Sequence, residues 1–449
     1  MYTPLYTALL DLYNKNQLSF HMPGHSGEKG MEGFSLLCEI DTTEVPESDN
    51  LFFADGPIAE AERAAAEFFG AKKTRLLVGG SSSGVLAMVG AAVREGEKII
   101  CDRFCHRSFV SALVFSGAVP VWITPESLEG GALWGGIAPA DVERALRENP
   151  DAKAVYITSP NYFGYASDVS AIAEIAHKYG AALLVDGAHG AHFGLSPLLP
   201  PAPWKCGADL CTVSAHKTLP ALTQAAWLHI NMDFPRLEAM LKMHQSSSPS
   251  YILMASLDYA RAKMEEEGER LWSGLAENSL AVFPEQGNVP GKYVKYKDPT
   301  RLVLPTGGNP FKAAERLRKE HGISVECSYG KGVVCITNIS HTAEDLRRLK
   351  AALCTAENSP SPVPGFTTEM HYAAMAPRRA FYADIEEVEL SEAAGRVCAR
   401  EVLLYPPGVP RVLPGEVVTE ADIAAISALI SAGGEVHGVE NGRICCVLM

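Results

Sequence analysis

Residues 208–230 have the sequence ADLCTVSAHKTLPALTQAAWLHI, in which Lys217 stands between two apolar segments. The segments 208–214 and 225–230 have the length and the apolar content that predict buried β-strands. A lysine at the end of such a strand is costly as a cation, because burial favours the neutral amine. A neutral amine is a nucleophile that forms Schiff bases with aldehydes. The ordinary alternative is a lysine whose charged end reaches the surface.

The sequence on either side alternates between short apolar segments and amphipathic segments. Further strands are predicted at 74–80, 97–102, 119–124, 152–158 and 181–186. Helices are predicted between them at 83–96, 106–117, 138–150 and 169–180. This repetition of β-α-β units predicts an α/β fold with a mainly parallel sheet.

A smaller α/β segment and a third unit follow the predicted sheet. A long helix at 251–283 leads to strands at 301–305, 323–328 and 332–339 and to helices at 310–322 and 342–356. We therefore predict five parts, with a Pro/Ser-rich linker before the last. They are an N-terminal segment at 1–50, a large domain at 51–295, a small α/β domain at 296–356, the linker at 357–369 and a C-terminal domain at 370–449.

The composition excludes several classes of protein. The 449 residues carry a formal net charge of -14, so the chain lacks the basic field that nucleic-acid binding requires. No apolar run has the roughly 18 residues of a membrane span, and the N-terminus lacks the features of a signal peptide. An odd number of cysteines, 11, without such a signal predicts reduced thiols and a cytoplasmic location. Cys101 and Cys105 have no second cysteine pair nearby, so we predict no metal site.

Polar residues follow the predicted strands at the carboxyl edge of the sheet, where open parallel sheets bind ligands. In chain order they occupy the segments 79–84, 102–106, 159–161, 186–189 and 214–217. The first segment contains Ser81, Ser82 and Ser83 in a small-residue turn before a helix, which suits a phosphate group. A capped tight turn without any ligand is the alternative.

The other segments supply a carboxylate and imidazoles. Asp186 ends an apolar strand, where a buried carboxylate needs a partner such as a protonated ring nitrogen or a backbone cap. His106 opens a predicted helix, where its ring can stack on a flat ligand or form a local hydrogen bond. His189 and His192 form a His-x-x-His pair, but no third ligand is spaced to complete a metal site.

Pyridoxal phosphate is a ligand that uses all of these groups together. Its aldehyde needs a lysine, and its phosphate needs hydroxyls and a helix N-terminus. Its pyridine nitrogen needs a carboxylate to stay protonated, and its ring face needs a flat neighbour. The order along the chain is phosphate turn, stacking histidine, aspartate and lysine, which fits a single sheet.

These residues lie in stretches that resemble fold-type-I pyridoxal-phosphate enzymes, and more closely the ornithine/lysine/arginine decarboxylase family in a short form without the N-terminal wing domain. The stretches span nearly the whole chain. They are HMPGH (21–25), SDNLFFADGPIAEAERAAAEFFGA (48–71), GGSSSGVLAM (79–88), CHRS (105–108), TSPNYFG (158–164), VDGAHGAHFG (185–194), SAHKTLPALTQ (214–224), SSSPSYILMASLDYAR (246–261) and YPPGVP (405–410). The resemblance implies an aspartate-aminotransferase-like large domain with a mainly parallel seven-stranded sheet, a small α/β domain and a C-terminal α+β domain.

The resemblance also implies roles for the catalytic residues. Lys217 would form the Schiff base with the cofactor, Asp186 would pair with the pyridine nitrogen, and His106 would stack on the ring. His189 would lie close to the cofactor, and so would Ala188.

The phosphate site would be shared between two subunits. In this subunit, the resemblance assigns the phosphate contacts to Ser81, Ser82, Ser83, Ser214 and His216. A loop at 245–248 of a partner subunit would complete the site through Ser247 and Ser248. This implies a homodimer or a higher even oligomer with a shared active site.

Three positions depart from the family pattern. Gly187 stands where the family commonly has glutamate, and Ser26 follows HMPGH where lysine is usual. Arg400 takes the place of an acidic residue upstream of the Tyr-Pro-Pro-Gly turn, and Glu401 follows it. An acid there is a plausible partner for a basic substrate tail, which an inward-pointing arginine would repel.

The sequence therefore predicts pyridoxal-phosphate-dependent decarboxylation of an amino acid, a basic one such as lysine, ornithine or arginine, to the amine and CO2, as in polyamine metabolism. Lys217 and His189 are both candidates for the proton donor. Transamination and elimination, which use the same cofactor, are the enzymatic alternatives. The three departures also leave open a catalytically altered, decarboxylase-like protein.

Overall fold

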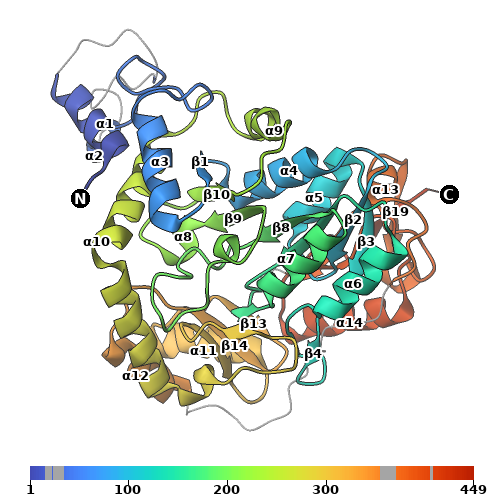
Figure 1. Cartoon of the computed structure of the whole chain (residues 1–449). Coiled ribbons are helices and arrows are strands. Elements are labelled where there is room, and N and C mark those ends of the chain that lie inside the picture. Colours follow the sequence, from blue (N-terminus) through green and yellow to red (C-terminus); the bar gives the residue numbers. More distant parts are fainter. Residues whose placement is uncertain (16–22, 24–34, 354–370, 405–407, 449) are drawn as a thin grey trace. The chain divides into compact units, whose positions relative to one another are not determined.

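The computed structural model describes residues 1–15, 23, 35–353, 371–404 and 408–448, and Figure 1 labels many of its helices and strands. Three predicted features fall largely or wholly outside the described residues. They are the HMPGH stretch with Ser26, the linker at 357–369, and the tyrosine and prolines at 405–407. None of the helices in the described part of the chain has both the length and the apolar character that crossing a membrane requires.

The main sheet has seven strands in the order β1-β10-β9-β8-β6-β2-β3. β2 runs parallel to β3 and β6, and β8 runs parallel to β9, whereas β10 is antiparallel to β9 and β1. The predicted α/β fold with a mainly parallel, seven-stranded sheet is therefore confirmed. The strands are β1 (Lys73–Leu77), β2 (Lys98–Asp102), β3 (Val119–Ile123), β6 (Ala154–Thr158), β8 (Ala182–Asp186), β9 (Leu210–Ser214) and β10 (Ala226–Ile230).

Ten helices accompany these strands in the described part of residues 1–282. They are α1 (Pro4–Asn14), α2 (Ser35–Cys38), α3 (Pro57–Phe69), α4 (Gly80–Ala92), α5 (Arg107–Ser116), α6 (Pro139–Glu148), α7 (Val169–Lys178), α8 (Ala215–Thr218), α9 (Leu237–His244) and α10 (Tyr251–Val282). α4 begins at Gly80, three residues before the predicted start. The reason is that Ser81–Ser83 form its first turn, in which the Ser83 hydroxyl donates to the Gly80 carbonyl oxygen at 2.8 Å.

The chain divides into two compact units, the first of which comprises residues 1–91 and 184–273. Its helix α1 starts at a proline. The helix is capped by a residue far away in the sequence, because Asp258 Oδ2 accepts the Leu5 N–H at 3.0 Å. Asp258 in turn forms a buried ion pair with Arg261 at 2.8 Å. These contacts fix the N-terminal helix on α10 within this unit.

The second unit comprises residues 92–183 and 274–449. It contains a small sheet in the order β12-β14-β13, on which α11 and α12 pack through buried side chains such as Leu317 and Leu346. The small α/β segment thus follows the prediction, except that only the end of the predicted strand 323–328 is extended. The elements are β12 (Arg301–Pro305), α11 (Pro310–His321), β13 (Cys327–Tyr329), β14 (Gly332–Ile336) and α12 (Ala343–Leu353).

The C-terminal segment of the second unit mixes helices with short antiparallel strands, as predicted. Its core contains Val388, Val412 and Ile426. Its elements are α13 (Pro377–Phe381), β15 (Ile385–Glu389), β16 (Val402–Leu404), β17 (Val409–Val412), α14 (Glu420–Ala432), β18 (Val436–His437) and β19 (Arg443–Val447).

Four short strands that were not predicted lie elsewhere in the second unit. They are β4 (Ser127–Leu128), β5 (Leu133–Trp134), β7 (Tyr165–Ala166) and β11 (Tyr296–Lys297).

His229 in β10 gives the first unit a pH-dependent contribution to stability. The side chain is fully buried, and burial lowers the pKa of its imidazole from 6.5 to about 3. Its Nδ1 lies 3.0 Å from Thr74 Oγ1, and its ring packs against Trp204. A depressed pKa means that this contribution is fully present above the unfolded value of 6.5 and is lost as the pH falls toward 3.

We expect the wild-type protein to lose about 1.4 kcal/mol more unfolding free energy than a His229→Gln variant between about pH 7.5 and about pH 5.5. Glutamine is uncharged at both values, so the variant reports the pH dependence of all other groups. Urea denaturation at the two pH values measures the difference. Equal losses in both proteins would contradict a neutral, buried His229.

Candidate active site

Asp186 and Ser214 end the parallel neighbours β8 and β9 in the first unit. Asp186 pairs with Thr212 in register, so both strands end at the same edge of the sheet. The Asp186 side chain is 3% exposed, and its Oδ1 accepts the Ala188 N–H at 3.0 Å. The Asp186 carboxylate is thus almost fully buried, at the position where the sequence predicts a buried carboxylate.

Gly187, directly after Asp186, packs against the neighbouring strand. A Cβ atom at this position would lie 3.0 Å from Cys211 Sγ and 3.2 Å from Val213 Cγ1. A larger residue would require both side chains to shift. The departure from the family's glutamate therefore has a local packing reason, since β9 fills that space.

Lys217 lies in the single turn of α8, directly after β9. Its Nζ is 3.0 Å from Nε2 of His189 on the loop after β8. The residue is half-buried, which lies between the buried amine and the surface lysine that the sequence left as alternatives. The structure thus brings together the two residues that the sequence left as candidates for the proton donor.

The three predicted serines occupy the first turn of α4. The Ser214 hydroxyl donates to Ser81 Oγ at 2.8 Å, which links the end of β9 to the start of this helix. Ser83 is buried and bonded within its own turn, whereas Ser82 is exposed. A Cβ at Gly84 would lie 2.3 Å from Thr212 Oγ1, so only glycine allows α4 to start this close to β9. A helix N-terminus with hydroxyls around it suits a phosphate group.

His216 stands between Ser214 and Lys217 in the chain. Its Nδ1 lies 3.1 Å from the carbonyl oxygen of Ala225, which holds the ring in place. Burial lowers the pKa of this imidazole below its ordinary value. The residue is therefore a neutral hydrogen-bonding group near neutral pH.

The predicted partner loop follows α9. Gln245 Oε1 accepts the Val78 N–H at 2.8 Å, which fixes the start of the loop beside β1. Ser247 and Ser248 are exposed, and the Ser248 N–H donates to Ser246 Oγ at 3.1 Å. The two serines therefore point to solvent in the single chain.

His106 belongs to the second unit, where it is the N-cap residue of α5. Its Nδ1 accepts the Ser108 N–H at 3.2 Å and lies 2.9 Å from Ser108 Oγ. The local hydrogen bond that the sequence left as an alternative is thus present. Because the bond engages the edge of the ring, it sets the direction in which the ring face points.

Arg400 and Glu401 lie in the C-terminal segment of the second unit. The Arg400 guanidinium donates to the carbonyl oxygens of Phe381 and Ala399, both at 2.9 Å, and lies 4.2 Å from the Phe381 ring centroid. Glu401 accepts a hydrogen bond from Arg107 at 2.9 Å. These bonds hold Arg400 on its own segment, while Glu401 is turned toward the residue next to His106.

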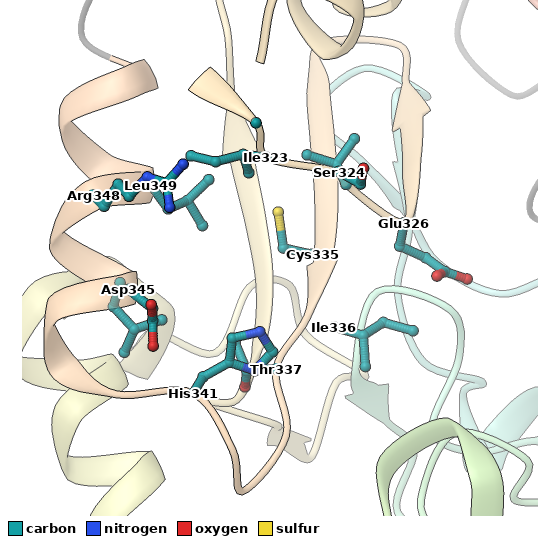
Figure 2. A pocket seen from close by; sticks show the side chains of 13 residues that line it. Ile323, Ser324, Glu326, Cys335, Ile336, Thr337, His341, Asp345, Arg348 and Leu349 are labelled. Atoms are coloured by element: carbon teal, nitrogen blue, oxygen red, sulfur yellow. The ribbon is translucent and has the colours of Figure 1, made fainter. Parts of the chain in front are cut away.

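A cavity of about 480 Å³ lies between α12 and the strands of the small α/β segment. Figure 2 shows side chains that line it. Cys335 points into it, and polar side chains such as Asp345 and Arg348 line it. Asp345 accepts the Thr342 N–H at the start of α12, and Arg348 donates to the His321 carbonyl oxygen. None of the predicted site residues lines this cavity, and its charged groups serve the local fold.

The groups at the ends of β8 and β9 fit pyridoxal phosphate. An amine is present for its aldehyde, a nearly dry carboxylate for its ring nitrogen, and hydroxyls with a helix N-terminus for its phosphate. The contact between His189 and Lys217 was not predicted, because the two residues lie 28 positions apart. The available signal was that each follows a strand that ends at the same edge of the sheet.

Comparison with known proteins gives the family. A model described as the major domain of Orn/Lys/Arg decarboxylases matches residues 3–285, and one described as their C-terminal domain matches residues 365–440. The arginine decarboxylase of Bacillus subtilis (strain 168) is 35% identical over 98% of this chain and 96% of that protein.

Solved structures share the fold at lower identity. The lysine decarboxylase LdcF of Francisella novicida superposes with a TM-score of 0.85 at 19% identity, over 99% of this chain and 81% of that one. An alanine–glyoxylate aminotransferase from Nostoc sp. has a TM-score of 0.53 at 17% identity, over 66% of this chain and 85% of that one. The chain therefore belongs to the Orn/Lys/Arg decarboxylase family and is a decarboxylase.

Proposed function

We propose that this protein uses pyridoxal phosphate to decarboxylate a basic amino acid, with L-arginine as the first candidate. The observation that carries the proposal is the 3.0 Å contact between Lys217 Nζ and His189 Nε2, with Asp186 buried on the neighbouring strand. The identity to the B. subtilis arginine decarboxylase supports arginine over lysine or ornithine.

Each predicted site residue receives a role in this proposal. Lys217 binds the cofactor aldehyde and Asp186 faces its ring nitrogen, while His106 has the stacking role that the resemblance gives it. Ala188 and His189 lie beside the cofactor. The phosphate is held by Ser81, Ser82, Ser83, Ser214 and His216, with Ser247 and Ser248 supplied by a partner subunit.

When bound, pyridoxal phosphate supplies an electron sink for the electron pair that is released as the Cα–carboxylate bond breaks. Asp186 contributes a fixed negative charge that favours a protonated ring nitrogen over a neutral one. Its hydrogen bond from the Ala188 N–H holds the carboxylate at one orientation. The charge is therefore in place before substrate arrives.

Lys217 and His189 can share a proton across their 3.0 Å contact. When the proton is on His189 Nε2, the Lys217 amine is neutral and nucleophilic. When the proton is on Lys217 Nζ, it is available for return to Cα after CO2 leaves. In this proposal the two candidates for the proton donor act together, as two parts of one relay.

The substrate's basic tail needs an acidic partner. Arg400 is held on its own segment by two carbonyl oxygens, which fix the direction of its guanidinium. Glu401 lines a cavity of about 360 Å³ together with Arg107 and Arg400. We propose that Glu401 takes the role of the family's acid, one residue later in the chain, by exchanging Arg107 for the substrate cation.

The test is a panel of L-arginine, L-lysine, L-ornithine and L-leucine with added pyridoxal phosphate, assayed for CO2 and for keto acid. We expect kcat/KM for arginine to exceed that for leucine by roughly 100-fold or more, because a buried charge match is lost with leucine. Keto acid without CO2 would favour transamination instead. A cofactor-loaded protein that turns over none of the four would favour the catalytically altered alternative.

A further inference from the structure

Arg103 is a buried cation three residues before His106 in the second unit. Its side chain is 3% exposed. Its guanidinium donates to the carbonyl oxygens of Pro410 at 3.0 Å and Arg411 at 2.9 Å, and to Glu416 Oε2 at 2.9 Å. All three of these acceptors belong to the C-terminal segment, some 300 residues away in the chain.

Glu416 is held as firmly as Arg103. It is 2% exposed, and its Oε2 also accepts the Leu413 N–H at 2.8 Å. Its carbonyl oxygen accepts the Cys398 N–H at 2.8 Å. A buried ion pair with fixed partners of this kind is weak support for stability, but it strongly constrains geometry.

Arg107, directly after His106, bonds to the same C-terminal segment. Its N–H donates to the Gly408 carbonyl oxygen at 3.1 Å, and its guanidinium donates to Glu401 at 2.9 Å. The short stretch that carries His106 is therefore tied on both sides to residues 401–416. The neighbours of His106 are thus bonded to that segment, while Ser108 holds the edge of the His106 ring.

We propose that Arg103 and Glu416 are positioning residues, through which the C-terminal segment sets the position of the short stretch that presents His106 to the cofactor. This inference rests on the proposed function, in which His106 stacks on the cofactor ring. It gives the C-terminal segment a second task in the reaction, besides the substrate contact proposed for Glu401: through Arg103 and Glu416 the segment acts on His106.

A purely structural role for the ion pair is the alternative, and Arg378 provides the matched control. Arg378 also ties the C-terminal segment to α5, but at the far end of the helix, where it donates to the Phe115 carbonyl oxygen at 2.8 Å. Loss of Arg378 weakens the attachment of the same segment without disturbing the residues around His106.

The experiment compares Arg103→Lys and Glu416→Gln with Arg378→Ala in the full chain. The measurements are the dissociation constant of pyridoxal phosphate, the absorption maximum of the bound cofactor, and the thermal midpoint. We expect the first two variants to raise the dissociation constant roughly five- to tenfold and to shift the absorption maximum. Arg378→Ala should lower the thermal midpoint and leave both cofactor measurements unchanged.

A double-mutant cycle with His106→Ala tests the route of the effect. If Arg103 acts through His106, Arg103→Lys should weaken cofactor binding no further when His106 is already alanine. Additive losses would overturn the inference, and so would unchanged cofactor affinity and spectrum in both Arg103→Lys and Glu416→Gln. If the wild-type protein itself bound no cofactor, the proposed function would fail and the inference with it, which is a different result from normal wild-type binding with unaffected variants.

Discussion

Replacing Lys217 by alanine should lower kcat at least about 10⁴-fold, equivalent to roughly 5.5 kcal/mol of transition-state stabilisation. It should also remove the visible absorbance that pyridoxal phosphate shows when its aldehyde is bound to a lysine. The reason is that Lys217 Nζ is the amine placed beside His189, so its loss removes both the covalent attachment and half of the proton relay. CO2 release and the absorption spectrum measure the two effects.

The control is Lys205→Ala, an exposed lysine of the same unit, which should keep both the absorbance and the activity. The sharpest competitor is Lys297 in the second unit, because burial lowers the pKa of its amine to about 7. Its Nζ already donates to the carbonyl oxygen of Asp298 at 2.7 Å and to that of Arg301. We therefore expect it to be structural.

Borohydride reduction of the loaded protein separates the two lysines. The reduction fixes the cofactor on the lysine that holds it, and mass spectrometry of the peptides identifies that lysine. Label on the peptide with Lys217 is the expected result. Label on the peptide with Lys297, or an undiminished absorbance in Lys217→Ala, would refute the assignment of the site.

The site residues that the sequence located best are those that follow buried strands. Short apolar segments set β8 and β9 by local composition alone, and parallel pairing then brings Asp186 and Ser214 to one edge. The order of the strands within the sheet was not needed to place these two residues. Lys217, one turn beyond Ser214, could be placed for the same reason.

The sequence could not predict which side chains contact one another. The hydrogen bond between Ser81 and Ser214 joins residues 133 positions apart, and its existence depends on how closely α4 packs on β9. α4 can pack this closely on β9 because residue 84 is a glycine, where a Cβ atom would collide with Thr212. The sequence does not show that these two residues are neighbours.

The direction of Arg400 shows the same limit. Position 400 is an arginine where the family has an acid, but the direction of its guanidinium could not be predicted from the sequence. Stacking on Phe381 and two carbonyl acceptors decide the direction, and both come from tertiary packing. The guanidinium is thus oriented by its own segment, in a cavity that Glu401 also lines.

Replacing Asp186 by asparagine should lower kcat about 10²- to 10³-fold while the protein stays folded. Asparagine has the same shape, and its Oδ1 can still accept the Ala188 N–H, so the loop after β8 should keep its geometry. What it lacks is the negative charge that favours a protonated ring nitrogen. Decarboxylation measured at saturating substrate, with the thermal midpoint as a check on folding, gives the result.

Asp258→Asn supplies the opposite pattern and so makes the Asp186 result interpretable. Asp258 is equally buried in the same unit, but its carboxylate pairs with Arg261 at 2.8 Å and caps α1, so its substitution leaves a buried arginine without its full counter-charge. We expect a lower thermal midpoint with kcat nearly unchanged. If both variants lost stability and activity together, the charge of Asp186 would have a role in folding. A fully active Asp186→Asn would mean that the reaction does not need a protonated ring nitrogen, and the proposed chemistry at β8 would be wrong.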